Sequence, residues 1–554
     1  MRVRFRACCR FGVDGNVPLP LKRKQACALQ RRATKILSGK NKFTAQYYEN
    51  DHCDLDAIGL KFNFSQTKDC NSEPNIGTAS IHSGGVTSRS GNSELDCRSA
   101  VPGLLSSVSA PAAGVTGSAA GCGDGSTMMR NPFFRRSRGV ALGAVLSACF
   151  IADYVSRAAA ENWPRFRGPN GSGISRDSRV PVEWNESAGL LWKSAIPGFG
   201  NSSPVVWGNR LFVQSASADG KERWLLCLDA SEGRILWTRS LPGSKAPINP
   251  RNTLASSTPA TDGRQVYAAF WDGTRVALSA YDMSGNLTWT RDLGTFTSQH
   301  GAGASPIVYK DKVIIAFDQD PSSTLLALRG GTGELLWQIP RKAFLACYST
   351  PFILETGGEP AQLAVTSTAG IAGYDPEDGR MIWEWSWVFP GQPLRTVGSS
   401  VHADGFLFAT SGDGGGARHM VALQISGKGK STQARLAWES TRTFPYVPSM
   451  IAWEGHLYWV SDLGLAGCNE IRTGKNLWTT RLGGNFTASP VLIDGKIYAA
   501  NEDGEVFVFA ASPSFKLLAK NGVGELVRAT PAVANNRLYI RGQNHLFCVA
   551  QPRD

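Results

Sequence analysis

A motif of Gly followed four positions later by Trp recurs between residues 233 and 478 of the 554-residue chain, and it constrains the fold most strongly. The Trp residues of this series, two of them without the Gly, are separated by 40 to 55 residues. Repeats of this length form small units that cannot bury a core alone, so neighbouring units must stack on one another. The complete copies are Gly233–Trp237, Gly285–Trp289, Gly333–Trp337, Gly379–Trp383 and Gly474–Trp478.

A second recurring element is a hydroxyl residue followed by Pro. Within each unit, turns such as Asp494-Gly495 separate short runs such as Ile497-Tyr498-Ala499-Ala500, a pattern typical of strands. The full copies are Ser203-Pro204, Thr258-Pro259, Ser305-Pro306, Thr350-Pro351, Ser489-Pro490 and Thr530-Pro531, with degenerate copies near Ser399-Ser400 and Pro448-Ser449. Eight units of four strands predict an all-β protein, an eight-bladed β-propeller over residues 184–554.

The last unit indicates how the ring closes. It begins at Thr530-Pro531, ends near Ala550, and lacks the strand that carries Trp in the other units. Leu190-Leu191-Trp192-Lys193, at the other end of the repeats, reads like such a strand. Pairing this N-terminal strand with the last blade would remove two exposed sheet edges, so we expect it to close the propeller.

The pattern resembles the pyrroloquinoline quinone (PQQ)-type propeller repeat, whose blades share the Gly-x-x-x-Trp signature. The resemblance covers about residues 184–550 and implies a quinoprotein dehydrogenase-like propeller in which each Trp packs between neighbouring blades. The segment Trp163–Gly173 also resembles the Trp-Pro-x-Phe-Arg-Gly opening of exported bacterial proteins of this type. We expect residues 161–183 to pack on the propeller through their aromatic side chains.

The chain before the propeller differs sharply in composition. Residues 1–160 hold 21 basic and 11 acidic side chains and no Trp, against 37 and 34 in the rest, so the basic excess is no evidence for nucleic-acid binding. We interpret residues 1–128 as a disordered or mis-assigned extension. Residues 129–160 have the basic, apolar and small-residue order of a signal peptide. Three alternatives stay open: cleavage after Ala160, lipidation of Cys149, which follows a lipoprotein-like Leu146-Ser147-Ala148, and an uncleaved anchor.

The resemblance implies two functions of different classes. The quinoprotein dehydrogenases hold PQQ beside Ca²⁺ and often carry adjacent half-cystines, whereas the propeller cysteines here, Cys227, Cys347, Cys468 and Cys548, are dispersed. We therefore expect no cofactor, no metal, no catalytic residue and no enzymatic activity, but a binding or scaffold module. The alternative is a PQQ-dependent quinoprotein oxidoreductase with a divergent site for PQQ and Ca²⁺. The export signal predicts a periplasmic, cell-envelope or secreted protein, tethered to a membrane if Cys149 is lipidated.

The loops predict where a partner binds. In a four-stranded blade, the connection to the next blade and the turn between the second and third strands lie on one face, where basic side chains would line an axial funnel and Asp residues would sit farther out. We expect this face of a monomer to take a protein partner or a polar or anionic ligand; solvated loops with Arg–Asp pairs are the other interpretation. The first set is Arg251, Asn252, Gln299, His300, Arg395, Asn485 and Arg528, and the second is Asp272, Asp318, Asp320, Asp413, Asp462 and Asp503.

Overall fold

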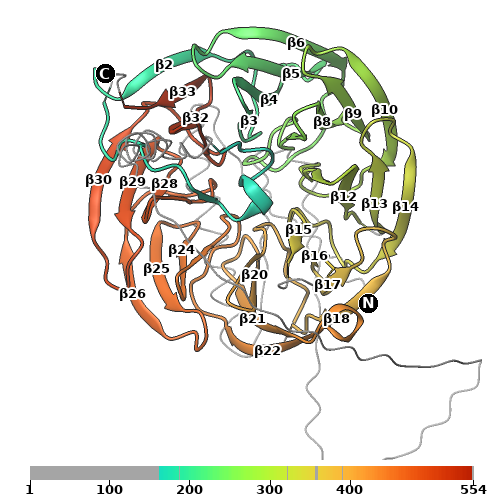
Figure 1. Ribbon diagram of the computed structural model, residues 1–554, viewed down its shortest axis with the longest axis vertical. Coiled ribbons are helices and arrows are strands. Elements are labelled where there is room, and N and C mark those ends of the chain that lie inside the picture. The colour runs from blue at the N-terminus through green and yellow to red at the C-terminus, as the bar shows by residue number, and fades with distance from the viewer. Residues whose placement is uncertain (1–160, 186, 321, 356–359, 390, 552–554) are drawn as a thin grey trace, which may run out of the picture. The chain divides into compact units, whose positions relative to one another are not determined.

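A ring of eight β-sheets forms the propeller (Figure 1). The computed structural model describes residues 161–551 except positions 186, 321, 356–359 and 390. The expected extension, the signal segment and Cys149 lie outside these residues. No helix in the described part of the chain is long and apolar enough to cross a membrane. The predicted all-β, eight-bladed fold is confirmed.

Each blade runs from an inner strand near the axis to an outer strand at the rim. Blade 1 comprises β3 (Val205–Trp207), β4 (Arg210–Ala216), β5 (Glu222–Asp229) and β6 (Ile235–Pro242). Blade 2 comprises β7 (Ala260–Thr261), β8 (Gln265–Trp271), β9 (Arg275–Asp282) and β10 (Leu287–Thr295). Blade 3 comprises β11 (Ile307–Tyr309), β12 (Lys312–Phe317), β13 (Ser323–Arg329) and β14 (Leu335–Arg341). Blade 4 comprises β15 (Phe352–Leu354), β16 (Gln362–Ser367), β17 (Gly370–Tyr374) and β18 (Met381–Ser386).

The second half of the ring repeats this order. Blade 5 comprises β19 (Val401–Ala403), β20 (Phe406–Gly412), β21 (Arg418–Ser426), the 3₁₀ turn η2 (Gly429–Ser431) and β22 (Gln433–Ser440). Blade 6 comprises β23 (Ile451–Trp453), β24 (His456–Val460), β25 (Leu465–Glu470) and β26 (Asn476–Arg481). Blade 7 comprises β27 (Val491–Ile493), β28 (Lys496–Ala500), β29 (Glu505–Ala510) and β30 (Leu517–Gly522). Blade 8 comprises β31 (Ala532–Ala534), β32 (Arg537–Arg541), β33 (His545–Val549) and, from the other end of the repeats, β2 (Leu190–Ala195).

The predicted closure is confirmed by the pairing of the first and last strands of the ring. β2 lies antiparallel to β33, with Lys193 opposite Phe547 and Ala195 opposite His545. Trp192 of this strand takes the place that a Trp of the outer strand takes in other blades, because its indole N–H reaches the carbonyl of Ala230 in blade 1 at 3.3 Å. Blade 8 is therefore complete only when both ends of the propeller chain have met.

The Trp residues pack between blades, as the resemblance implied. The indole of Trp289 donates to the carbonyl of Gly330 at 2.7 Å, and its ring lies against Gly333 of the next blade. The motifs at Gly233, Gly285 and Gly333 therefore each have two partners: the Trp docks on the Gly of the following blade, and the Gly receives the Trp of the preceding blade. The same docking joins Trp192 to Gly233, Trp237 to Gly285, Trp337 to Gly379 and Trp438 to Gly474.

The hydroxyl residues before the inner strands form a ring of hydrogen bonds, here called the hydroxyl belt. In seven steps the backbone N–H of one member donates to the side-chain oxygen of the member in the next blade, at 2.9–3.1 Å. The last of these steps runs from Thr530 of blade 8 to Ser203 of blade 1, so the belt crosses the closure. Its members are Ser203, Thr258, Ser305, Thr350, Ser399, Ser449, Ser489 and Thr530, which include both degenerate copies of the sequence motif.

The four propeller cysteines are free and buried, and they pack as small apolar residues. Burial raises the pKa of the Cys347 thiol to about 11, so it stays protonated at neutral pH. The core itself lies between blades. It is made of the alternating side chains of neighbouring sheets, such as Leu326 and Leu328 of blade 3 against Tyr267 and Leu278 of blade 2.

The Trp–Gly contact can be tested by a pair of Gly substitutions. Gly333→Ala places a methyl group 2.6 Å from the Trp289 ring at a φ of +72°, whereas Gly495 has a φ of +67° with open space around the added carbon. Both variants should lose about 1–2 kcal/mol from backbone strain. Gly333→Ala should lose a further ~1–3 kcal/mol from overpacking, measured as the shift of the urea unfolding midpoint. Equal losses in the two variants would refute the docking role.

Candidate functional site

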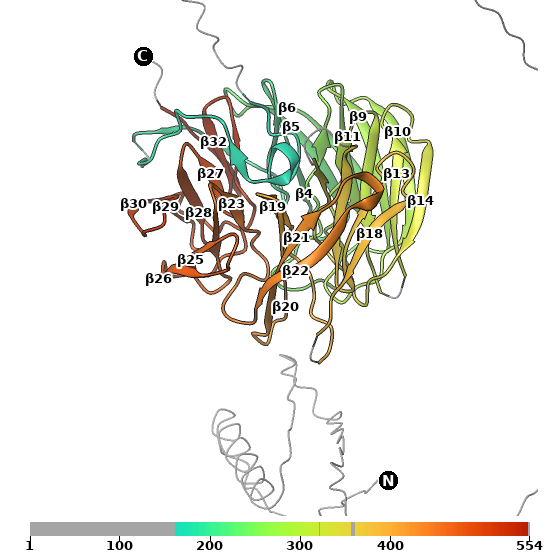
Figure 2. The same ribbon diagram turned by 60° about the horizontal axis from the view of Figure 1, so that its bottom comes forward.

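The propeller has two different faces. The loop face carries the connections between blades together with the turns between the second and third strands of each blade. The opposite face, here called the plug face, carries residues 161–175, here called the plug, which include η1 (Pro169–Gly171) and β1 (Ile174–Ser175). Figure 1 shows the plug at the centre of the ring, and Figure 2 shows that it lies on one side of the blades.

On the loop face, each connection is hydrogen-bonded to the turn of the blade that it enters. The backbone N–H of Ser244 donates to the carbonyl of Asp272 at 2.6 Å, and the backbone N–H of Asp320 donates to the carbonyl of Thr297 at 3.0 Å. Arg395 and Gly412 form an antiparallel bridge in the same way. The two kinds of loop therefore lie side by side and hold one another in place.

Two of the expected basic residues share one carboxylate that sequence reasoning did not single out. Arg528 donates to Glu502 from Nε at 3.3 Å and from Nη2 at 3.2 Å, while Nε of Arg251 lies 3.9 Å from the other carboxylate oxygen. Arg528 also donates to the carbonyl of Pro250 at 3.3 Å. The connection that leaves blade 1 thus reaches blade 7, and its tip crosses the loop face.

The same tip of this connection also contacts His300. Asn249 Nδ2 lies 3.3 Å from His300 Nδ1, and Asn252 Nδ2 donates to the His300 carbonyl at 2.7 Å. Burial, and then repulsion by Arg395, lower the pKa of His300 below its usual value. The imidazole is therefore neutral at pH 7, with Nδ1 as the acceptor for Asn249.

Arg395 is buried, not solvent-facing, and it donates to the carbonyl of Ala346 at 2.7 Å. Its charge acts on Tyr348 and Tyr446, two neighbours that sequence reasoning missed. Burial raises the pKa of both phenols to about 12 against the opposing effect of this guanidinium. Arg418 lies over the Tyr446 ring at 5.3 Å. This side of the loop face is therefore aromatic and cationic.

The Asp residues of the second set do not form a common outer ring. Asp318 is buried in an ion pair with Arg341, at 2.9 and 3.1 Å, so the expectation that it sits on the loop surface is wrong. Asp462 is also buried and accepts from the backbone N–H groups of Tyr446 and Val447. Asp320 accepts from that of Ala346. These carboxylates order the connections, whereas Gln299, Asn485 and Asp503 are exposed and Asp413 is half-buried.

The loop face also exposes large apolar side chains beside blade 4. The side chain of Phe344 is 58% exposed and that of Val388 is 78% exposed. The connections that carry these two residues are fixed to the same turn of blade 4. The backbone N–H of Phe344 donates to Thr368 Oγ1 at 2.7 Å, and the backbone N–H of Trp387 donates to the carbonyl of Ala369 at 2.9 Å. These apolar side chains are thus exposed to solvent on connections that hydrogen bonds hold in place.

On the plug face, the plug is held by polar side chains more than by the expected aromatic ones. Arg167 is fully buried and donates to the carbonyls of Gly171, Ser172, Met450 and Pro490 at 2.6–3.3 Å. Burial, and then repulsion by Arg165, lower its pKa to about 9, which leaves the guanidinium charged at neutral pH. Carbonyl dipoles converge on this charge in place of a carboxylate. Trp163 is buried as expected, whereas Phe166 is only half-buried.

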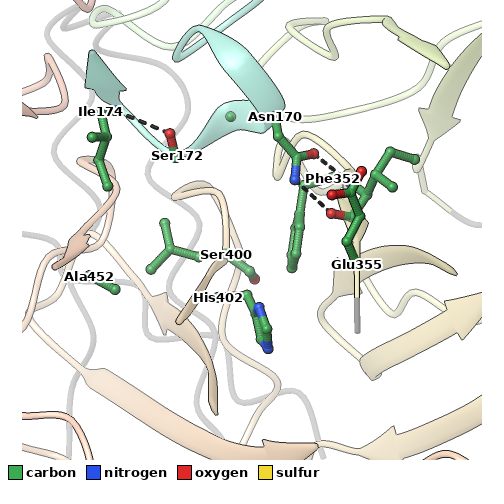
Figure 3. A pocket seen from close by; sticks show the side chains of 11 residues that line it. Asn170, Ser172, Ile174, Phe352, Glu355, Ser400, His402 and Ala452 are labelled. Atoms are coloured by element: carbon green, nitrogen blue, oxygen red, sulfur yellow. Dashed lines mark hydrogen bonds between the residues drawn. The ribbon is translucent and has the colours of Figure 1, made fainter. Parts of the chain in front are cut away.

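A pocket of about 130 Å³ lies between the plug and the inner strands of blades 4, 5 and 6 (Figure 3). Asn170 and Ser172 of the plug form one wall, and Phe352, Ser400 and His402 lie across from them. Nε2 of His402 is buried without a hydrogen-bond partner among the described residues. The sequence offered no sign of this pocket, because its two walls are more than 180 residues apart.

The residues on the two faces do not match what a site for PQQ with Ca²⁺ would need. The described part of the chain contains no group of three or more His, Cys, Asp or Glu side chains that could hold a metal ion. Asp318, the most buried acid of the second set, is already paired with Arg341. We therefore derive no catalytic step through this cofactor.

Comparisons with known proteins give one family and several distant structures. The family model described as outer membrane protein assembly factor BamB matches residues 176–345 and 358–514. BamB from Moraxella catarrhalis is 16% identical over 65% of this chain and 99% of its own, with a TM-score of 0.48. Quinohemoprotein alcohol dehydrogenase from Comamonas testosteroni is 14% identical over 73% of this chain and 83% of its own, with a TM-score of 0.49. No curated protein sequence matches the chain.

The role of Arg167 can be tested by its removal. Arg167→Met leaves the carbonyls of Met450 and Pro490 buried without a donor, so it should cost about 3–5 kcal/mol of unfolding free energy. Arg176→Met, an exposed change a few residues along the same segment, should cost less than about 0.5 kcal/mol. Thermal unfolding of both variants measures the difference, and a parental melting temperature for Arg167→Met would contradict this role.

Proposed function

The chain belongs to the family of outer membrane protein assembly factor BamB, and on that premise we propose that it is an exported, non-catalytic module that docks a protein partner on its loop face. The matched residues span more than half of the chain and most of the propeller. The name of the family denotes a protein that assists the assembly of other proteins, which favours a protein as the partner.

The observation that carries this proposal is the pair Phe344 and Val388. Exposed apolar side chains held by a fixed frame lose little freedom when they bind, so more of the contact energy is kept as affinity. The frame is rigid behind Val388, because Trp387 stacks on Phe389 and donates to Nδ1 of His419 at 3.0 Å. His419 is in turn 2.8 Å from Glu439. Apolar anchors of this kind carry most of the energy in protein interfaces.

A basic residue beside this patch gives it specificity. Lys342 lies on the same connection as Phe344, where it is 3.1 Å from Glu384. Charged groups at the rim of an apolar patch steer a partner and fix its orientation more than they add affinity. A protein segment with an apolar side chain flanked by acidic ones fits this arrangement.

Compartment and anchoring are part of the proposal. The family name places its namesake at the outer membrane, and the signal-like residues 129–160 favour export of this chain. We propose a periplasmic or cell-envelope location, with Cys149 as the lipid attachment site if processing stops there. N-terminal sequencing of the exported protein distinguishes a start at Cys149 from a start near Glu161.

The partner surface is tested by an apolar double substitution in the full chain. Phe344→Ser with Val388→Ser should weaken capture of envelope partners at least about tenfold, because two interface anchors are lost. The matched control is Leu287→Ser with Met381→Ser, two side chains exposed to a similar degree at the rim of the propeller. The control should capture the same partners as the parent. Equal capture by all three proteins would exclude the loop face beside blade 4.

The alternative, a PQQ-dependent oxidoreductase, has a separate test. Purified protein incubated with PQQ and Ca²⁺ should show no substrate-dependent reduction of an artificial electron acceptor with alcohols or sugars. Dye reduction that requires PQQ would replace the binding-module proposal with the oxidoreductase.

A further inference from the structure

The inner strand of each blade turns one edge toward the propeller axis. The third residue after each belt member has its backbone N–H and C=O on this edge, since alternate residues of a strand bond to opposite sides. Val206 and Ile353 are two such residues, and the second strands of their blades pair with them in the same register. Eight edges of this kind surround the axis, and each needs hydrogen-bond partners.

The plug supplies those partners for four blades. Trp163 exchanges two backbone hydrogen bonds with Val206 of blade 1, at 2.8 and 2.9 Å, and the carbonyl of Pro164 accepts from Thr261 of blade 2 at 2.8 Å. The carbonyl of Gly173 accepts from Leu492 of blade 7 at 2.8 Å. The plug thus serves as an added inner strand for these blades.

At blade 4 a side chain does the same work as a strand. The carboxamide of Asn170 accepts from the backbone N–H of Ile353 at 2.8 Å and donates to its C=O at 2.6 Å. A primary carboxamide can do this because its oxygen and one of its N–H bonds point the same way. Figure 3 shows the two bonds side by side at the wall of the pocket.

The corresponding edges of blades 5 and 6 face the pocket. Ile353 is the third residue after its belt member Thr350. His402 and Ala452 are likewise the third residues after Ser399 and Ser449. All three pair with the second strands of their blades in the same register. Both residues line the pocket. The plug bonds described above stop short of them. The pocket therefore contains a strand edge in blade 5 like the edge of blade 4 that Asn170 pairs with.

Two side chains add chemistry to this edge. The imidazole of His402 lines the pocket with Nε2 buried and unpartnered, and burial lowers its pKa, so it is neutral at pH 7 with one donor and one acceptor nitrogen. Glu355, exposed at the end of blade 4's inner strand, adds a carboxylate to the lining. An ammonium group is the natural counterpart of that carboxylate.

We propose that this pocket binds a small molecule that carries a primary carboxamide and an ammonium group. The carboxamide pairs with the backbone N–H and C=O of His402 as Asn170 pairs with Ile353, and the ammonium group lies beside Glu355. The volume of about 130 Å³ limits the ligand to a few non-hydrogen atoms. This site is on the plug face and is independent of the partner surface proposed above.

The probe is glycinamide, which has both groups and five non-hydrogen atoms. The full chain is labelled with ¹⁵N in its seven histidines, and the imidazole signal absent from His402→Leu identifies His402. Titration with glycinamide should shift this signal with a Kd on the order of 1 mM, reasonable for so small a ligand. Glycine N-methylamide should bind at least about fivefold more weakly, because its trans amide cannot donate and accept on one edge.

Two variants locate the ammonium group. Glu355→Gln should weaken glycinamide binding about three- to tenfold and leave acetamide, which has no amine, unchanged. Asp404→Asn removes an exposed carboxylate from the nearest turn of blade 5 and should leave both affinities at the parental value. Three results would overturn the site: no His402 shift up to about 50 mM glycinamide, equal binding of the N-methylamide, or equal glycinamide binding by parent and Glu355→Gln.

Discussion

The hydroxyl belt is the interaction on which the rest of the propeller depends. It consists of backbone N–H groups donating to Ser and Thr oxygens of the next blade, and it crosses the closure between Thr530 and Ser203. All of its members are buried, so each unpaired N–H would cost free energy comparable to a lost hydrogen bond. The belt fixes the start of every inner strand at the same height and radius. The strand edges that face the axis follow from this arrangement, and so do the positions of the plug and the pocket, which contact those edges.

The Trp residues make the complementary contact at the rim. At the junctions that carry both contacts, belt and Trp hold neighbouring blades at two radii. The junction between blades 4 and 5 departs from this pattern. Trp383 donates to Gln362 of its own blade at 2.8 Å, and blade 5 has Ala434 at the position where five other blades have the receiving Gly. Gln362 in turn donates to Thr432 of blade 5 at 2.8 Å and restores the link between the two blades.

The fold could be predicted from the sequence because its determinants are local and repeated. A Gly with positive φ and a Trp four residues later are visible in five of the units, and a hydroxyl residue precedes every inner strand. The candidate sites could not be predicted in the same way. Glu502 looks like any turn acid until the connection from blade 1 brings Arg251 to it. Asn170 and Ile353 are 183 residues apart, and no sequence pattern around either residue indicates the contact.

The expectations that concerned charge were the least accurate, for a physical reason. The sequence predicts that loop Arg side chains line an axial funnel and that Asp side chains sit farther out, yet Arg395, Asp318 and Asp462 are buried. Connections on the loop face are long, and their backbone N–H and C=O groups need partners once neighbouring loops cover them. Charged side chains supply those partners. The exposed groups that remain for binding are therefore fewer, and more apolar, than the sequence suggested.

The plug sets the order in which this protein can fold. Arg167 contacts Pro490 across 323 residues, and β2 cannot pair until β33 has been synthesised, so these two early segments of the propeller meet these partners late. Contacts so distant in sequence require loop closure before they contribute any stability, which slows folding. A chain of this design stays open until its last blade has been synthesised. It becomes a closed ring with a filled centre only after its final strand has arrived.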